Sequence, residues 1–148
     1  MDSTTKARLI TLAREAAGKA HAPYSRFHVG CAVMAEDGSV VTGANMENAC
    51  YRLGLCAEQS ALTAAQHAFG LAAITHVVVA GGPIADGAIA GEDVITPCGG
   101  CRQAIAEAAS LSGRDIVVIS ASATGGEMLE TTISQLLPHG FGADVLPG

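Results

Sequence analysis

The fold of this chain is decided by a short apolar stretch, ITHVVVA, at residues 74–80. Its run of β-branched residues indicates a buried strand. Residues 81–95 have the composition of a loop, and Thr96 with Pro97 then predicts the start of a helix that ends near Ser110, since a hydroxyl residue caps a helix and proline suits its first turn. A second apolar run at 115–120 completes a strand–helix–strand unit.

Segments on either side of this unit continue the alternation of strands and helices. The expected elements are a helix over residues 6–20, a hairpin with strands at 27–34 and 40–42 around Asp37-Gly38, a helix over 56–69, an edge strand over 127–131 and a last helical turn over 133–137. This order predicts a single α/β domain spanning residues 1–148, in which a mixed sheet is covered by helices on both faces.

Composition and charge narrow the classes of function. The 148 residues carry a formal net charge of −6, with 8 basic against 14 acidic side chains. Because binding of nucleic acid depends on Lys and Arg neutralising phosphates, we expect a small-molecule partner and no nucleic acid. The apolar stretches are far shorter than the roughly 20 residues of a membrane helix, and no secretory signal is visible. We therefore expect a soluble, cytoplasmic protein without a membrane partner.

Three of the five cysteines form a pattern that is typical of a metal site. Cys98 and Cys101, spaced i and i+3 at a helix start, can direct both sulfurs toward one point, and a strand-to-helix crossover can bring Cys56 beside them. Three protein ligands leave one position open, which is the arrangement of catalytic zinc. Glu58, two residues after Cys56, is placed to reach that position. We therefore predict one Zn²⁺ ion and a catalytic role for Glu58.

Two other interpretations of the Cys98-Gly99-Gly100-Cys101 segment stay open. A Cys-x-x-Cys pair at a helix start also describes redox dithiols, and a structural zinc module could bind a partner without catalysis. A dithiol requires neither Cys56 nor Glu58, and the structural module lacks an obvious fourth ligand. Both are therefore less favoured than the catalytic zinc site.

The cysteine and glutamate pattern resembles the signature of the zinc deaminases of nucleobases, in which His or Cys, any residue and Glu precede Pro-Cys-x-x-Cys. With Cys as the first ligand, this chain is similar to the small cytidine deaminases that act on free nucleosides. Three further stretches carry the same resemblance over most of the chain. They are Ala22-Pro23-Tyr24-Ser25-Arg26-Phe27-His28-Val29-Gly30, Asn45-Met46-Glu47-Asn48-Ala49, and Leu136-Leu137-Pro138 before Phe141.

This resemblance implies a three-layer α/β/α cytidine deaminase-like fold with a mixed, mostly five-stranded sheet and one zinc ion per subunit. It implies hydrolytic deamination of cytidine and 2′-deoxycytidine to the uridine nucleosides with release of ammonia, a step of pyrimidine salvage. It also implies a homotetramer with shared active sites. The implied substrate-binding residues are Phe27 against the pyrimidine, Asn45 and Glu47 at the ribose hydroxyls, Ala57 in the pocket, and Ala49, Tyr51 and Phe141 for an adjoining subunit.

Charge balance at the predicted centre singles out two more residues. Three thiolates give the zinc centre a net negative charge, which helix amino termini at Cys56 and Cys98 can offset. Arg102 is a further candidate for this electrostatic role. The family commonly has Arg after Cys-Ala-Glu, whereas this chain has Gln59, whose amide donates a hydrogen bond but supplies no charge. Our hypothesis is that water at the zinc is less acidic here than in the Arg-bearing relatives.

Substrate breadth stays open within the enzyme interpretation. Deaminases of modified or N4-substituted cytosine nucleosides, such as blasticidin S, also use Cys-Ala-Glu and are the nearest alternative. The stretch from Asn45 to Asn48 favours an ordinary ribose.

Overall fold

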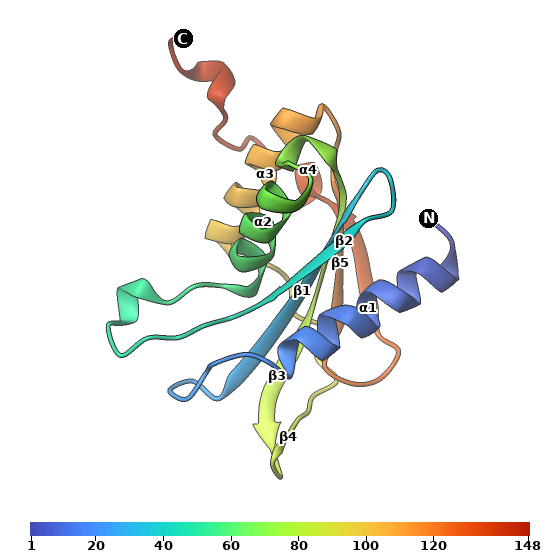
Figure 1. Ribbon diagram of the computed structural model, residues 1–148, viewed down its shortest axis with the longest axis vertical. Coiled ribbons are helices and arrows are strands. Elements are labelled where there is room, and N and C mark those ends of the chain that lie inside the picture. The colour runs from blue at the N-terminus through green and yellow to red at the C-terminus, as the bar shows by residue number, and fades with distance from the viewer.

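A computed structural model describes all residues, 1–148, and shows one sheet between two layers of helices (Figure 1). The continuous path of the sheet runs β2-β1-β3-β5-β6, and a short sixth strand, β4, pairs with β3. The strands are β1 (Phe27–Ala35), β2 (Val40–Ala44), β3 (Ile74–Ala85), β4 (Ala88–Ile89), β5 (Val117–Ser122) and β6 (Met128–Thr132). The predicted hairpin is β1 with β2, and its turn contains Gly38 at φ 89°.

Helices cover both faces of the sheet, as the sequence predicts (Figure 1). One apolar layer joins Leu9 and Ala13 of α1 to Val78 and Ile119 of the sheet. The opposite layer joins α2 and α3 to the other face and includes the fully buried Ile105 of α3. The helices are α1 (Ser3–Ala17), α2 (Ala57–Ala68), α3 (Gly99–Ser112) and α4 (Ile133–Leu136), with short 3-10 turns at Tyr51–Leu53, Leu71–Ala73 and Ala143–Val145. None of these helices has the length and apolar character needed to cross a membrane.

Two glycines let the helices approach the sheet closely. A Cβ atom added at Gly30 of β1 would collide with the backbone of Ala13 in α1. One added at Gly43 of β2 would lie 2.5 Å from the backbone nitrogen of Ala61 in α2. The position of α2 on the sheet therefore depends on the missing side chain at Gly43.

Strand directions place the starts of α2 and α3 together. β3 and β5 are the one parallel pair, and α3 forms the crossover between them, while β1–β2, β1–β3, β3–β4 and β5–β6 pair antiparallel. α2 and α3 lie next to each other on the same face (Figure 1). Their first turns carry the predicted metal ligands.

Residues 81–85 were expected in a loop, and this expectation is wrong. β3 continues through them, pairing Gly81 with Val29 and Pro83 with Phe27. Gly-Gly-Pro is typical of turns, but here Gly81 lacks the Cβ that would collide with the carbonyl of His28, so the strands stay paired. β4 then returns along β3 within the same predicted loop.

Several boundaries differ by two or three residues from the prediction. Cys98, not Thr96, is the N-cap of α3, so the helix starts after Pro97. Asp2 caps α1 by accepting a hydrogen bond from the backbone nitrogen of Thr5 at 2.7 Å. The helix therefore begins at Ser3, three residues earlier than predicted.

Candidate active site

The starts of α2 and α3 bring the three predicted cysteine ligands together. Cys56 is the N-cap of α2, Cys98 is the N-cap of α3, and Cys101 lies in the first turn of α3. Their sulfur atoms all lie within 4.8 Å of one another, and Cys98 Sγ is 3.5 Å from Cys101 Sγ. A tetrahedral zinc ion with Zn–S bonds of about 2.3 Å requires sulfurs about 3.8 Å apart. The cluster therefore fits one zinc ion.

The electrostatics of this cluster also fit a cation. The backbone N–H of Cys101, at the start of α3, lowers the pKa of the Cys98 thiol. Burial raises the pKa of the Cys56 and Cys101 thiols, and the nearby Glu58 carboxylate raises both further. Thiolates that are buried beside a carboxylate need a positive charge, which a divalent metal supplies.

Glu58 lies in the first turn of α2 and is only 5% exposed. Burial raises the pKa of its carboxyl. Together with Cys56 and Cys98 it lines a cavity of about 400 Å³, which we call the base cavity. The full lining is Phe27, Val29, Asn45, Cys56, Ala57, Glu58, Val79, Ile95, Thr96 and Cys98. A buried carboxylate therefore faces the same space as two of the sulfur ligands.

A second cavity of about 390 Å³ adjoins the base cavity and shares Asn45 and Cys56 with it. We call it the ribose cavity. Its lining is Tyr24, Ser25, Asn45, Glu47, Asn48, Tyr51, Gly54, Leu55 and Cys56. Two adjoining cavities, the second of which contains the side chains of Asn45, Glu47 and Asn48, provide room for the two halves of a nucleoside.

Hydrogen bonds to the backbone hold both predicted ribose-binding side chains. Glu47 Oε1 accepts from the backbone nitrogens of Tyr24 at 2.9 Å and Ser25 at 3.1 Å. Hydrogen bonds from Ser25 lower the pKa of the Glu47 carboxyl, so it is ionised at neutral pH. Asn45 accepts from the backbone nitrogen of Val29 at 2.8 Å and donates to the carbonyl of Phe27 at 2.9 Å. The loop before β1 therefore positions Glu47, and β1 itself positions Asn45.

The remaining predicted contacts divide into two groups. Phe27 and Ala57 line the base cavity, and Tyr51 lines the ribose cavity with its ring 5.9 Å from that of Tyr24. Ala49 is exposed and lines neither cavity. Phe141 is 61% exposed and belongs instead to a surface cavity with Ser110, toward the end of α3. Within one copy of the chain, the structure does not bring Ala49 or Phe141 to the site.

Gln59 hydrogen-bonds the cysteine cluster, whereas Arg102 does not. Gln59 Nε2 donates to Cys101 Sγ at 3.7 Å, which is the contact expected of a neutral amide. The Arg102 guanidinium donates to the carbonyls of Pro97 and Leu136 and to the hydroxyl of Thr96, and none of these hydrogen bonds reaches a sulfur. Gln59 is therefore the side chain that joins α2 to a ligand of α3.

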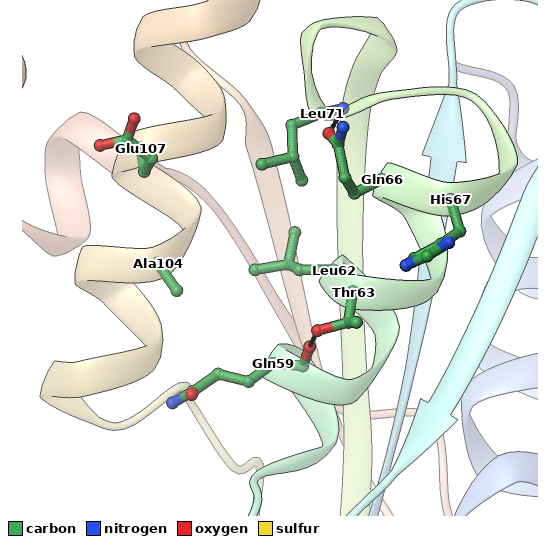
Figure 2. Close-up of a pocket in the computed structure, with 8 residues that line it drawn as sticks. All are labelled: Gln59, Leu62, Thr63, Gln66, His67, Leu71, Ala104 and Glu107. Atoms are coloured by element: carbon green, nitrogen blue, oxygen red, sulfur yellow. Dashed lines mark hydrogen bonds between the residues drawn. The ribbon is translucent and has the colours of Figure 1, made fainter.

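A further cavity, of about 390 Å³, lies between α2 and α3 (Figure 2). Its lining is Gln59, Leu62, Thr63, Gln66, His67, Leu71, Ala104 and Glu107, and it contains no cysteine. Gln59 is the lining residue that also hydrogen-bonds the cluster. The candidate active site is therefore the base cavity, not this groove.

Sequence reasoning missed four residues that line the base cavity: Val29, Val79, Ile95 and Thr96. Val79 could have been found from strand alternation, because it shares a face of β3 with the buried Val77. Thr96 adjoins the Pro97-Cys98 motif. Ile95 had no signal, since it lies in a connection whose path is set by tertiary contacts.

Comparison with known proteins decides the family. Residues 3–119 match the family model described as the cytidine and deoxycytidylate deaminase zinc-binding region. The chain belongs to this deaminase family. A cytidine deaminase of Halalkalibacterium halodurans is 40% identical over 136 residues, covering 92% of this chain and 93% of the relative.

Solved structures of the deaminase family share the fold. The cytidine deaminase of Burkholderia pseudomallei matches with a TM-score of 0.79 and 35% identity, covering 95% of this chain and 100% of that one. The cytidine deaminase of Mycobacterium tuberculosis matches with a TM-score of 0.71 and 32% identity, covering 93% and 97%. These matches confirm the predicted resemblance, the α/β fold class and a zinc-dependent deaminase.

Proposed function

We propose that this chain hydrolyses cytidine and 2′-deoxycytidine to uridine and 2′-deoxyuridine with release of ammonia. The observation that carries this proposal is the buried Glu58 carboxylate, which faces the base cavity beside Cys56 and Cys98. A redox dithiol or a non-catalytic zinc module needs no such carboxylate. Adjoining cavities for a base and a sugar support a nucleoside substrate.

Cys56, Cys98 and Cys101 would hold the zinc ion, which supplies the Lewis acidity that makes water a nucleophile at neutral pH. Glu58 then moves the protons. Its carboxylate takes one proton from the water that attacks C4 and delivers it to ring nitrogen N3. It then takes the remaining proton from the new C4 hydroxyl and gives it to the amine, which leaves as ammonia when the C4–N4 bond breaks and the C4 carbonyl forms. Burial raises the pKa of this carboxyl, which favours the protonated form that donates in the second half of each transfer.

Other side chains bind and orient the substrate. Phe27 and Ala57 line the base cavity and pack against the pyrimidine. Glu47 and Asn45 receive the ribose hydroxyls, with the backbone contacts described above fixing both side chains. Gln59 tunes the centre by donating to Cys101 Sγ without adding charge.

Charge at the ribose cavity favours a free nucleoside over a nucleotide. Glu47 is ionised there, and no Lys or Arg lines the cavity. A phosphate on the sugar would meet a carboxylate and find no cation, which disfavours binding. We therefore assign cytidine and 2′-deoxycytidine as substrates, not deoxycytidylate.

The proposal includes a homotetramer that shares its active sites. Two large apolar side chains at this end of the molecule are exposed: Tyr51, which lines the ribose cavity, is 79% exposed, and Met46, between Asn45 and Glu47, is 55% exposed. Phe141 is exposed and lies outside the cavities of its own copy, so it is free to complete the pocket of a neighbour, as Ala49 is. The three reduced cysteine ligands are consistent with a cytoplasmic location.

A substrate panel tests this proposal. We expect ammonia release from cytidine and 2′-deoxycytidine, with kcat/KM for deoxycytidylate lower by about tenfold or more, since its phosphate would lie near the Glu47 carboxylate with no cation in the cavity to pair with it. Glu47→Gln, which removes the charge, should narrow that gap. Preference for deoxycytidylate, or for N4-substituted cytosine nucleosides of the blasticidin S type, would contradict the proposed substrate.

A further inference from the structure

Residues 92–97 form a wall of the base cavity, which we call the strap. Ile95 and Thr96 of the strap line the cavity, and Cys98 follows it directly. No backbone–backbone hydrogen bond involves the strap. Its upstream end is tied where the carbonyl of Gly91 accepts from the backbone nitrogen of Thr124 at 3.1 Å. Its downstream end runs into Cys98, the N-cap of α3, and side-chain contacts supply the remaining hydrogen bonds there.

Arg102 fastens that downstream end. Its Nε donates to the carbonyl of Pro97 at 2.8 Å, and Nη2 donates to Thr96 Oγ1 at 3.3 Å. Nη1 donates to the carbonyl of Leu136, at the end of α4, at 2.9 Å. The planar guanidinium thus joins the strap, the first turn of α3 and α4 in one rigid fork, which a flexible ammonium group cannot reproduce.

We propose that Arg102 is a positioning residue for the reaction rather than a source of charge at the metal. It holds the strap so that Ile95 and Thr96 keep the base cavity closed on one side and Cys98 keeps its place beside Cys101. This inference rests on the proposed nucleoside deaminase function. It replaces the electrostatic role that the sequence suggested for Arg102, because the hydrogen bonds of the guanidinium go to the strap and α4.

Arg114 provides a matched control. It also donates to backbone carbonyls, those of Ala72 and Ile74 at 3.4 Å each, and it pairs with Glu36. It follows the far end of α3 and lines neither the base cavity nor the ribose cavity. Arg114→Met therefore removes an arginine that bonds the backbone without touching the strap.

The experiment compares the zinc-loaded parent, Arg102→Met, Arg102→Lys and Arg114→Met. For Arg102→Met we expect KM for cytidine and the rate of zinc dissociation to a chelator each to rise about tenfold or more, since several charged hydrogen bonds are lost. Arg102→Lys, which keeps one charged donor, should fall between that variant and the parent. Amide hydrogen exchange at position 102 and at Leu137, whose N–H groups bond the carbonyls of Cys98 and Ile133 beside the guanidinium, should accelerate in Arg102→Met and stay parental in Arg114→Met.

Two outcomes separate this inference from the proposed function. If Arg102→Met matches Arg114→Met in KM, zinc dissociation and local exchange, the positioning role is wrong even though the parent deaminates cytidine. If the parent releases no ammonia from any cytosine nucleoside, the proposed function fails, while zinc dissociation and amide exchange at position 102 and Leu137 still decide whether Arg102 holds the strap. Parental exchange in Arg102→Met would then overturn the inference.

Discussion

Substituting Gly43 with alanine should misplace the catalytic helix. An added Cβ would lie 2.5 Å from the backbone nitrogen and 2.9 Å from the Cα of Ala61 in α2. Ordinary contacts between such atoms are about 3.5–4.0 Å, so β2 and α2 would have to separate by about 1 Å. Because α2 carries Cys56 and Glu58 at its start, we expect kcat/KM for cytidine to fall about 100-fold, the cost typical of such a displacement.

The assay for Gly43→Ala combines activity, zinc content and thermal unfolding. Overpacking of this kind costs about 1–3 kcal/mol, and each kcal/mol lowers the Tm of a chain of this size by about 2–4 °C. Gly126→Ala is the control, because no atom lies within 4 Å of a Cβ added there. Parental activity and zinc content in Gly43→Ala would refute the argument that close packing at Gly43 positions the site.

Three further outcomes follow from the contacts of the site. Gln59→Ala, which removes the donor to Cys101 Sγ, should weaken zinc binding about tenfold in a chelator competition, whereas His67→Ala in the neighbouring groove should not. Glu47 has a pKa lowered by Ser25, so its contribution to stability is complete above its unfolded pKa of about 4.3 and is lost as the pH falls through the lower folded value. The Tm of Glu47→Gln should therefore fall less steeply than that of the parent below about pH 4.3, and parallel curves would contradict this. Zinc at a thousandfold excess over its Kd stabilises the fold by about 4 kcal/mol, so removal of zinc by a chelator should lower the Tm by about 10 °C. Added Zn²⁺ but not Mg²⁺ should restore the Tm. An unchanged Tm in the chelated protein would argue against a metal that contributes to folding.

The sequence could predict those parts of the fold that local chemistry determines. The apolar run at 74–80 and the Asp37-Gly38 turn mark elements that the structure contains, because β-branched residues and a glycine at positive φ act locally. Cys98 and Cys101 are three residues apart at a helix start, so their proximity follows from helix geometry. The expected strand-to-helix crossover was enough to predict that Cys56 lies beside Cys98 and Cys101, as it does in the structure.

Other features depend on tertiary contacts that no local pattern records. Gly81 and Gly82 stay in β3 because neighbouring backbone occupies the space of their missing side chains, although Gly-Gly-Pro is typical of turns. Ile95 reaches the base cavity through a connection tied at Gly91 and at the Arg102 guanidinium. The position of Arg102 after a ligand suggested an electrostatic role, whereas its hydrogen-bond partners could be identified only in three dimensions.

The central claim is that Glu58 moves protons at a zinc centre held by three cysteines. The direct measurement is zinc content together with cytidine-dependent ammonia release for the parent and for Glu58→Gln. We expect one zinc per subunit in both proteins, and activity in the parent that falls by at least about 100-fold in the variant. A zinc-loaded parent that is inactive on every cytosine nucleoside would favour a binding module, zinc-free protein that reduces disulfides would favour a redox dithiol, and full activity in Glu58→Gln would contradict the assigned role of Glu58.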